Sequence, residues 1–131
     1  MLKQRPNDVN LVIKHFPLPM HRFAEKASLA ALAAAQQNKY EEMSRALFSD
    51  FQNLSDESIK KQAETAGLDM AKFNAALSAP ALKKQIDEDR QLGMSINVRG
   101  VPAMFLNGRV VKDRSVQGLS SMIDEELKKG K

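Results

Sequence analysis

The most informative part of this sequence is Asn97-Val98-Arg99-Gly100-Val101-Pro102-Ala103-Met104-Phe105-Leu106-Asn107-Gly108-Arg109. Pro102 follows the β-branched Val101 and stands where a strand begins, a position at which its missing N–H is tolerated. A second interpretation is a cis Val101–Pro102 bond, which turns the backbone and leaves the polar groups of Val101 available to another chain. Local sequence favours the first interpretation, because cis X–Pro bonds are uncommon.

A hairpin follows this proline. Residues 103–106 and 109–112 are short apolar or β-branched runs, which predicts two strands. Asn107-Gly108 joins them, and this dipeptide tolerates a positive φ at both positions, as a type I′ turn requires.

The chain before the hairpin is predicted to be one strand followed by helices. Residues 9–15 are short, β-branched and apolar, which favours a buried strand that ends before Pro17. Apolar spacing then predicts helices over 20–37, 39–48 and 56–66, a helix that begins after Asp69, a helix over about 80–92, and a closing helix over 116–127.

Local signals set the expected helix ends. Ser55 and Asp69 are good N-caps, Asn38 is a third candidate, and Gly67 suits a left-handed helix end. Within the helix over 39–48 we expect Met43, Leu47 and Phe48 to be buried. A helical segment between β elements indicates an α/β fold rather than a helical bundle.

Composition limits the chemistry that is available. The chain has 131 residues, a length typical of one domain, and no cysteine. This excludes disulfides, thiolate metal sites and a cysteine nucleophile supplied by these residues. The two histidines, His15 and His21, have no neighbours that complete a metal site, and no Gly-rich phosphate loop is present, so we expect no metal and no cofactor.

Charge favours no nucleic-acid or membrane partner. The net charge is +4, but basic residues mostly stand beside acids, as in Asp87-Glu88-Asp89-Arg90, which predicts solvated helix faces. One tyrosine and no tryptophan leave little stacking surface for single strands. No apolar run approaches the roughly 20 residues of a membrane span.

Together, the motifs resemble the DsbA-like thiol–disulfide oxidoreductases of the thioredoxin superfamily. The first matching block is Leu11-Val12-Ile13-Lys14-His15-Phe16-Pro17-Leu18, followed by an alanine-rich run and Gln37-Asn38-Lys39-Tyr40. The second block comprises Ile86, Asp89, Gly93, Val98, Gly100, Val101, Pro102, Phe105, Asn107, Gly108 and Arg109. It is similar to the family's stretch Gly-Val-x-Gly-Thr-Pro-Thr-Phe-Phe-Ile-Asn-Gly, which holds the cis-proline loop. Asn38 and Ala103 depart from the family's usual Gly and Thr, and both changes are tolerable.

The serious departure is at the front of the chain. The family places a strand and then a Cys-x-x-Cys helix ahead of the strand that matches 9–15, and only eight residues precede Val9. We therefore expect an N-terminally truncated DsbA-like chain that lacks the redox centre.

The resemblance implies an α/β, thioredoxin-like fold with a helical insertion, without its first strand and first helix. Residues 1–131 are expected to form a single domain fragment, with 9–19 and 95–131 as thioredoxin core and 20–94 as insertion. The missing strand leaves unpaired edges at 9–15 and 103–106, and such edges are costly. We expect dimerisation or strand swapping, a place within a longer protein, or a different closure of the sheet.

The function implied is that of a fragment of a periplasmic disulfide-exchange protein acting on protein or peptide thiols. Its substrate-binding residues are expected to be Gly100, Val101, Pro102 and Ala103, with Val101 pairing with the peptide backbone and Pro102 packing against the disulfide. The parent is expected to be an enzyme, whereas this chain has no catalytic residue of its own. Two alternatives stay open: a redox-inactive thioredoxin-like peptide-binding or partner-binding domain, and a relative of the kappa-class glutathione transferase and isomerase type.

Overall fold

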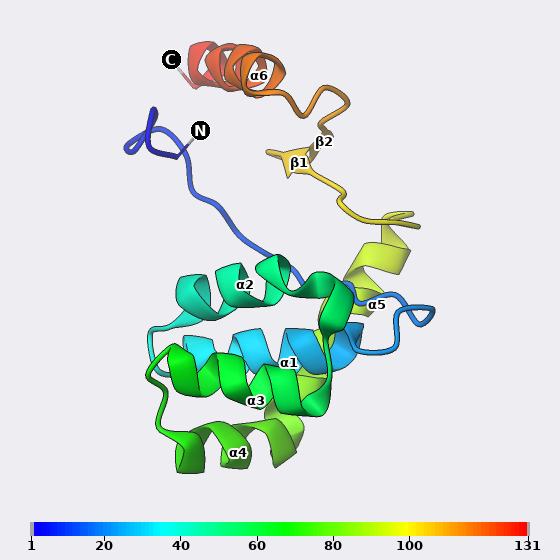
Figure 1. The fold of residues 1–131 in the computed structure, drawn as a ribbon. Coiled ribbons are helices and arrows are strands. Elements are labelled where there is room, and N and C mark those ends of the chain that lie inside the picture. The colour runs from blue at the N-terminus through cyan, green and yellow to red at the C-terminus, as the bar shows by residue number, and fades with distance from the viewer. Residues whose placement is uncertain (1, 131) are drawn as a thin grey trace. The chain divides into compact units, whose positions relative to one another are not determined.

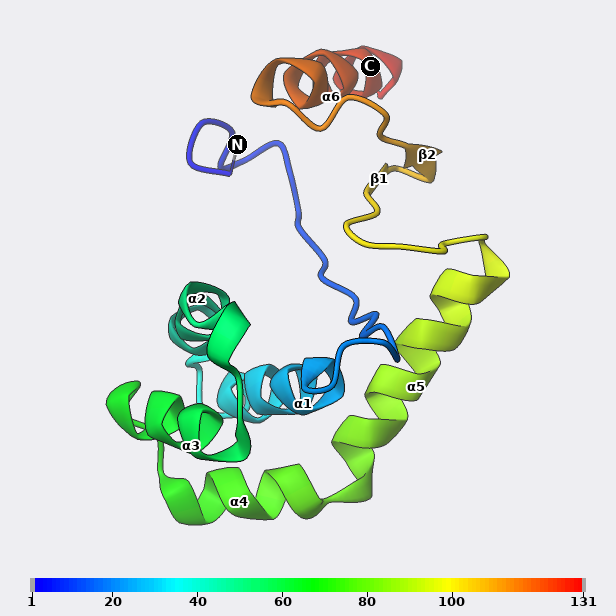
Figure 2. The same ribbon diagram turned by 45° about the vertical axis from the view of Figure 1, so that its right-hand side comes forward.

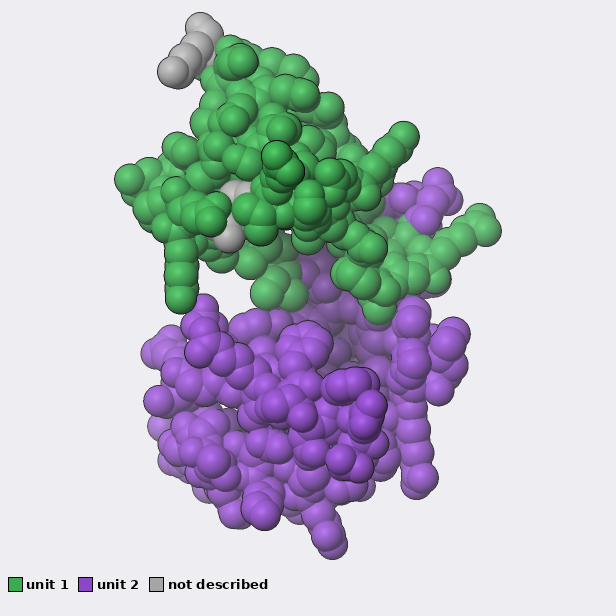
Figure 3. All heavy atoms as spheres, turned by 45° about the horizontal axis from the view of Figure 1, so that its top comes forward, with its two compact units in different colours: residues 1–13, 98–131 green, residues 14–97 purple. Residues whose placement is uncertain are grey.

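The computed structural model describes residues 2–130, and the chain divides into two compact units (Figure 3). Unit 1 comprises residues 1–13 and 98–131, and unit 2 comprises residues 14–97. No helix among residues 2–130 combines the length and apolar character needed to cross a bilayer.

Unit 2 is entirely helical (Figure 1). Its elements are α1 (Ala24–Ala35), α2 (Tyr40–Ser49), the short 3₁₀ helix η1 (Phe51–Asn53), α3 (Asp56–Thr65), α4 (Met70–Ser78) and α5 (Pro80–Ser95). Pro80 occupies the first turn of α5, as predicted, where its missing N–H has no helical partner to lose.

The alanine-rich helix α1 is the centre of unit 2. It contacts α2, α3, α4 and α5, and Figure 2 shows it among them. Residues 30–34 of α1 are all buried. A helix that is buried on every side needs small apolar side chains so that several neighbours can approach it. Around it lie the largest fully buried side chains of the molecule, Phe73, Met43 and Ile86.

The predicted caps of the middle helices are confirmed. The Ser55 side chain accepts a hydrogen bond from the Ser58 N–H at 3.0 Å, and the Ser58 hydroxyl accepts one from the Ser55 N–H at 2.8 Å. The Asp69 carboxylate likewise accepts from the Lys72 N–H. Gly67 has a φ of +81° after the last turn of α3, which is the left-handed ending that favours glycine.

Two local predictions for unit 2 are wrong. Asn38 does not cap α2; it has a φ of +60° in the turn after α1, a conformation that asparagine tolerates, and Lys39 is the residue before α2. Phe48 is 79% exposed, although Met43 and Leu47 are buried. Met43 and Leu47 are four residues apart and share a helix face, and Phe48 is turned about 100° from Leu47 and about 140° from Met43.

Unit 1 contains the hairpin and the last helix. β1 (Phe105–Leu106) pairs antiparallel with β2 (Arg109–Val110), and α6 (Val116–Lys129) follows. Asn107 has a φ of +48° and Gly108 one of +81°, as the predicted turn requires. The strands are two residues long rather than four, and Val111 and Ile123 are the buried apolar side chains of this unit.

The strand predicted over 9–15 does not form. These residues have no regular structure, and Leu11, Val12 and Ile13 are 61%, 71% and 53% exposed. Within residues 2–130 the sheet contains β1 and β2 alone. A strand needs a neighbour for its ladder of hydrogen bonds, and an apolar run without one stays extended and exposed.

Gly118, in the first turn of α6, packs against Asp113. A Cβ at position 118 would lie 2.7 Å from the Asp113 Cβ, too close for two carbon atoms. We expect Gly118→Ala to displace Asp113, whose carboxylate accepts the Ser115 N–H at 3.0 Å, and to lower the melting temperature by about 4 °C. Ser121→Ala, in the same helix and exposed, is the control, and thermal circular dichroism is the measurement. A melting temperature of Gly118→Ala at or above that of the control contradicts this packing.

Candidate functional site

The four predicted site residues, Gly100 to Ala103, are consecutive and exposed in the segment that leads into β1. The Val101–Pro102 peptide bond is cis. The Val101 side chain is 54% exposed, and no hydrogen bond joins the Val101 backbone to another described residue of unit 1. The N–H and C=O of Val101 are therefore available to a second chain. A side chain at Gly100 would meet no atom within 4 Å, so space alone does not require glycine there.

The outer edge of β1 continues this row of available backbone groups. Val111 donates its N–H to the Met104 carbonyl at 2.9 Å, and Leu106 pairs with Arg109. Because polar groups of an antiparallel strand alternate between its two edges, those of Ala103 and Phe105 face away from β2. An extended peptide can add to a strand edge of this kind.

Two residues that the sequence analysis did not include complete the site. The Arg114 Nη1 donates to the Pro102 carbonyl at 2.6 Å and so ties the proline to the segment after β2. Lys112 and Arg114 line a shallow hollow, whose other lining residues are Pro102, Ala103, Met104, Phe105, Val110 and Val111. The sequence contained a signal for these two residues. If the register of the predicted hairpin is continued past the pair Met104 and Val111, residues 112–114 lie opposite residues 101–103.

The turn of the hairpin is fastened to α6. The Arg109 Nη1 contacts Glu126 Oε1 at 2.8 Å and Glu125 Oε2 at 3.2 Å, and Asn107 donates to Glu126 Oε2 at 3.3 Å. Lys129 lies 3.2 Å from Glu126. The hydrogen bonds from Arg109 above all, and then from Asn107 and Lys129, lower the pKa of Glu126 from 4.5 to about 2. Glu126 therefore links the turn of the hairpin to α6 through Arg109 and Asn107.

This lowered pKa predicts a pH-dependent stability. A carboxyl whose pKa is lower in the folded state stabilises the fold above its ordinary pKa, and the effect is lost as the pH falls toward the folded value. Glu126→Gln is expected to lower the urea midpoint most above about pH 5 and hardly at all near pH 2, followed by circular dichroism. Glu64→Gln, exposed on α3, is the control. A difference between wild type and Glu126→Gln that does not change with pH contradicts the role of Glu126.

A buried carboxylate in unit 2 holds the segment before α1. Asp89 is 7% exposed, and its Oδ2 accepts the His15 backbone N–H at 3.0 Å. Lys14 Nζ lies 3.7 Å from Asp89 Oδ1. The prediction that the charged run 87–90 is a solvated face is therefore wrong for Asp89. The next residue, Arg90, donates from Nη2 to the Pro17 carbonyl at 3.2 Å. Two residues of α5, Asp89 and Arg90, therefore form hydrogen bonds with the segment before α1.

His15 takes part in the same cluster but has no metal neighbours. Its Nε2 lies 3.3 Å from the Tyr40 hydroxyl, and the two rings meet edge to face. Burial lowers the pKa of His15 from 6.5, although the Asp89 carboxylate acts in the opposite direction. A neutral imidazole is thus favoured, which suits a hydrogen bond to the tyrosine. The described residues 2–130 contain no group of three side chains able to hold a metal ion.

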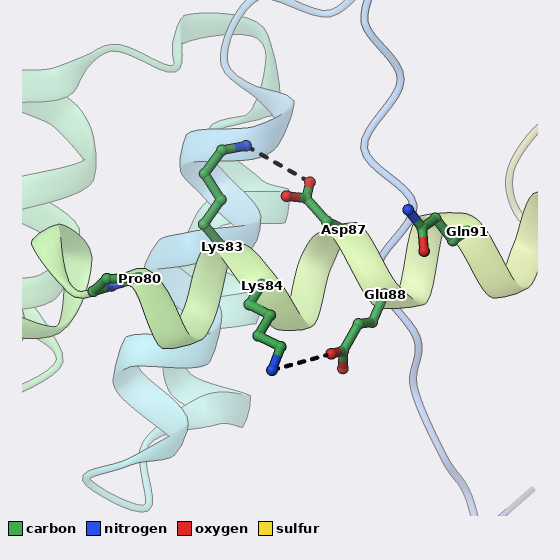
Figure 4. A pocket seen from close by; sticks show the side chains of 6 residues that line it. All are labelled: Pro80, Lys83, Lys84, Asp87, Glu88 and Gln91. Atoms are coloured by element: carbon green, nitrogen blue, oxygen red, sulfur yellow. Dashed lines mark ion pairs between the residues drawn. The ribbon is translucent and has the colours of Figure 1, made fainter.

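The exposed face of α5 is a row of ion pairs rather than a site. Figure 4 shows Lys83 beside Asp87, at 3.6 Å, and Lys84 beside Glu88, at 3.8 Å. These residues line an open hollow together with Pro80 and Gln91. Each cation already has its own acid, so no unbalanced charge remains for a ligand. Within the charged run 87–90, the prediction of a solvated face is confirmed for Glu88, which is exposed.

Comparison with known proteins gives two kinds of relative. The Na(+)/H(+) antiporter NhaA 3 of Salinispora tropica is 32% identical over 102 residues, which cover 77% of this chain and 16% of the antiporter. The thiol:disulfide interchange protein DsbL of Escherichia coli O6:H1 is 30% identical over 67 residues, covering 50% of this chain and 30% of DsbL. The chain thus spans a minor part of each of these relatives.

A solved structure matches over most of the chain. The thiol–disulfide exchange protein alpha-DsbA2 of Wolbachia pipientis superposes with a TM-score of 0.78 at 25% identity, covering 95% of this chain and 70% of that one. The chain is thus a thioredoxin-fold protein of the DsbA-like type, mostly helical with a small two-stranded sheet. Residues 1–124 match the model of the DSBA-like thioredoxin domain, and the chain belongs to that family.

Proposed function

We propose that this chain is the peptide-binding part of a DsbA-like thiol–disulfide exchange protein and supplies no reacting thiol. The observation that carries this proposal is a DSBA-like match over residues 1–124 in a sequence without cysteine. In disulfide exchange a thiolate attacks a disulfide sulfur, one new S–S bond forms, and the displaced sulfur leaves as a thiolate. The dithiol for this reaction comes from outside these 131 residues, so the chain is a fragment in functional terms.

Within this proposal, Gly100 to Ala103 form the contact with substrate. The Val101 N–H and C=O pair with the backbone of an extended peptide, and the outer edge of β1 prolongs the pairing. Support comes from the exposed, unbonded backbone of Val101 within unit 1. Pro102 is assigned the position beside the disulfide in the intact protein.

The partners and location follow from the family. Protein or peptide thiols are the proposed substrates, and the periplasm is the proposed compartment. A homodimer or strand swap through the outer edge of β1 is proposed for the isolated chain, because an unpaired edge is a template for another strand. Multi-angle light scattering that gives only the monomer mass, over a wide range of concentration, would contradict the dimer.

A second candidate function is that of a binding domain without thiol chemistry. The observation in its favour is the likeness to antiporters, of which the chain covers 16–17% in the examples from Salinispora and Mycobacterium. In this alternative the same loop binds a peptide segment, and no dithiol is involved at any stage. Reading the gene upstream of Val9 separates the two, since a Cys-x-x-Cys within about 30 residues favours exchange.

Binding is tested by titrating isotope-labelled chain with a cysteine-free, uncharged extended peptide and following the backbone amides by NMR. The expected result is a saturable change centred on residues 100–105. Binding centred elsewhere, or none at all, contradicts the proposed function. As a companion, dithiothreitol reduction of insulin is expected to run at the same rate with and without the chain, and acceleration contradicts the claim that no reacting thiol is present.

A further inference from the structure

The net charge of this protein belongs entirely to unit 1. Unit 1 carries nine Lys and Arg residues and five Asp and Glu residues, a balance of +4. Unit 2 carries eleven of each and is neutral. The basic character of the chain is thus concentrated in the unit that contains the loop.

Four of the five acids of unit 1 are paired with Arg5 or Arg109, and the fifth, Asp113, stands between Lys112 and Arg114 in the sequence. Asp8 and Asp124 pair with Arg5, at 3.7 and 2.7 Å, and Glu125 and Glu126 pair with Arg109. The fifth acid, Asp113, accepts the Ser115 N–H at the start of α6. The basic residues that flank the loop on both sides, Arg99, Lys112 and Arg114, have no carboxylate partner among residues 2–130.

The hollow beside the loop is lined by both apolar and basic residues. We call its apolar lining residues the floor (Pro102, Ala103, Met104, Phe105, Val110 and Val111) and its basic lining residues the rim (Lys112 and Arg114). Both rim side chains are exposed, so their charges reach solvent. Arg114 holds the Pro102 carbonyl, which fixes one of these charges directly beside the site.

We propose that this hollow selects extended peptides in which acidic side chains flank an apolar residue. The apolar side chain occupies the hollow, and the carboxylates lie against Lys112 and Arg114. This inference rests on the proposed function, because it specifies the peptide that the loop between Gly100 and Ala103 accepts. Charge of one sign around a site raises the encounter rate and excludes partners of the same sign.

A peptide fits this surface better than a nucleic acid does. Single-stranded nucleic acids are held by aromatic side chains on which successive bases stack, in addition to basic grooves. Phe105 is the single aromatic residue in the lining of the hollow. The other floor residues are aliphatic or Met, which matches apolar peptide side chains.

The test compares three blocked peptides of one length, with a common Val-Thr-Val centre flanked by Glu, Gln or Lys. Affinities are measured by calorimetry with the whole chain at about 20 mM and about 300 mM salt. The Glu peptide is expected to bind about fivefold more tightly than the Gln peptide at low salt, and the Lys peptide more weakly than both. The preference is expected to shrink at high salt, because the rim is exposed and screened.

Charge-removing variants test whether the preference for the Glu peptide depends on the rim residues. Lys112→Gln is expected to reduce the Glu-over-Gln ratio about twofold, and Lys128→Gln, the same charge change in the last turn of α6, to leave it unchanged. Equal binding of all three peptides at residues 100–105 overturns the selectivity and leaves the proposed function standing, whereas no binding of any peptide overturns both. A dT oligonucleotide that binds more tightly than the Glu peptide also overturns it.

Discussion

Replacing Phe73 by alanine is expected to lower the free energy of unfolding of unit 2 by about 3–5 kcal/mol. Phe73 is fully buried in α4 and is among the largest fully buried side chains of the chain. Its removal costs both the transfer of an aromatic ring out of the core and the cavity that remains. Helices packed against the small residues of α1 have little freedom to close that cavity.

Urea unfolding followed by the fluorescence of Tyr40 measures this effect. The chain has no tryptophan, and Tyr40 is its sole tyrosine. Because Tyr40 belongs to unit 2, its fluorescence reports the unfolding of that unit. Phe48→Ala is the matched control: it removes the same ring from a side chain that is 79% exposed, and is expected to change the free energy by less than about 0.5 kcal/mol. Equal effects of the two substitutions contradict the assigned core.

Asp89→Ala is expected to have the second largest effect, a loss of about 2 kcal/mol. The change leaves the His15 N–H without its acceptor at 3.0 Å and removes the partner of Lys14. A buried donor that loses its acceptor retains the full cost of leaving water. The segment before α1 is expected to loosen from α5, with faster hydrogen exchange at His15.

Two further substitutions separate charge from hydrogen bonding. Asp89→Asn keeps a carbonyl that can accept from His15 and is expected to lose less than Asp89→Ala. Glu88→Ala, next to it on α5 but exposed and paired only with Lys84, is expected to have little effect. If Glu88→Ala is as damaging as Asp89→Ala, burial of Asp89 is not the cause.

Much of the helical unit was predictable because its signals are local. The Ser55 and Asp69 caps, the Gly67 ending and the Asn107-Gly108 turn each depend on three or four adjacent residues. Helix caps and tight turns of this kind form in the same way whatever the tertiary structure of the rest of the chain.

Apart from the Asn38 cap, the errors concern features that depend on distant residues. Residues 9–15 have the composition of a strand, but a strand forms only beside a partner, and none of the described residues provides one. Asp89 belongs to a charged run whose composition predicts an exposed helix face. It is buried because residues 14–15 pack onto α5, and His15 is 74 positions away from Asp89 in the sequence. The face on which Phe48 lies was likewise decided by packing around α1.

The candidate site contains residues that were named from the sequence and residues that were not. Residues 100–103 were named from the resemblance of 98–109 to a cis-proline stretch, and that stretch is contiguous in sequence. Lys112 and Arg114 lie beyond the hairpin turn, and their place beside Pro102 follows only when the register Phe105 to Val110 is extended. Their importance depends as well on the pairing of four of the five acids of unit 1 with Arg5 or Arg109, and most of these pairs join residues that are distant in the sequence.

If the loop binds an extended peptide through the Val101 backbone, hydrogen exchange at the Val101 amide slows when the peptide binds. In the unbound chain this amide has no acceptor in unit 1 and is expected to exchange rapidly. With a saturating cysteine-free peptide its exchange is expected to slow by about tenfold or more, while the exposed amide of Gly108 keeps its rate. Unchanged exchange at Val101 while the peptide is bound would contradict binding through the Val101 backbone.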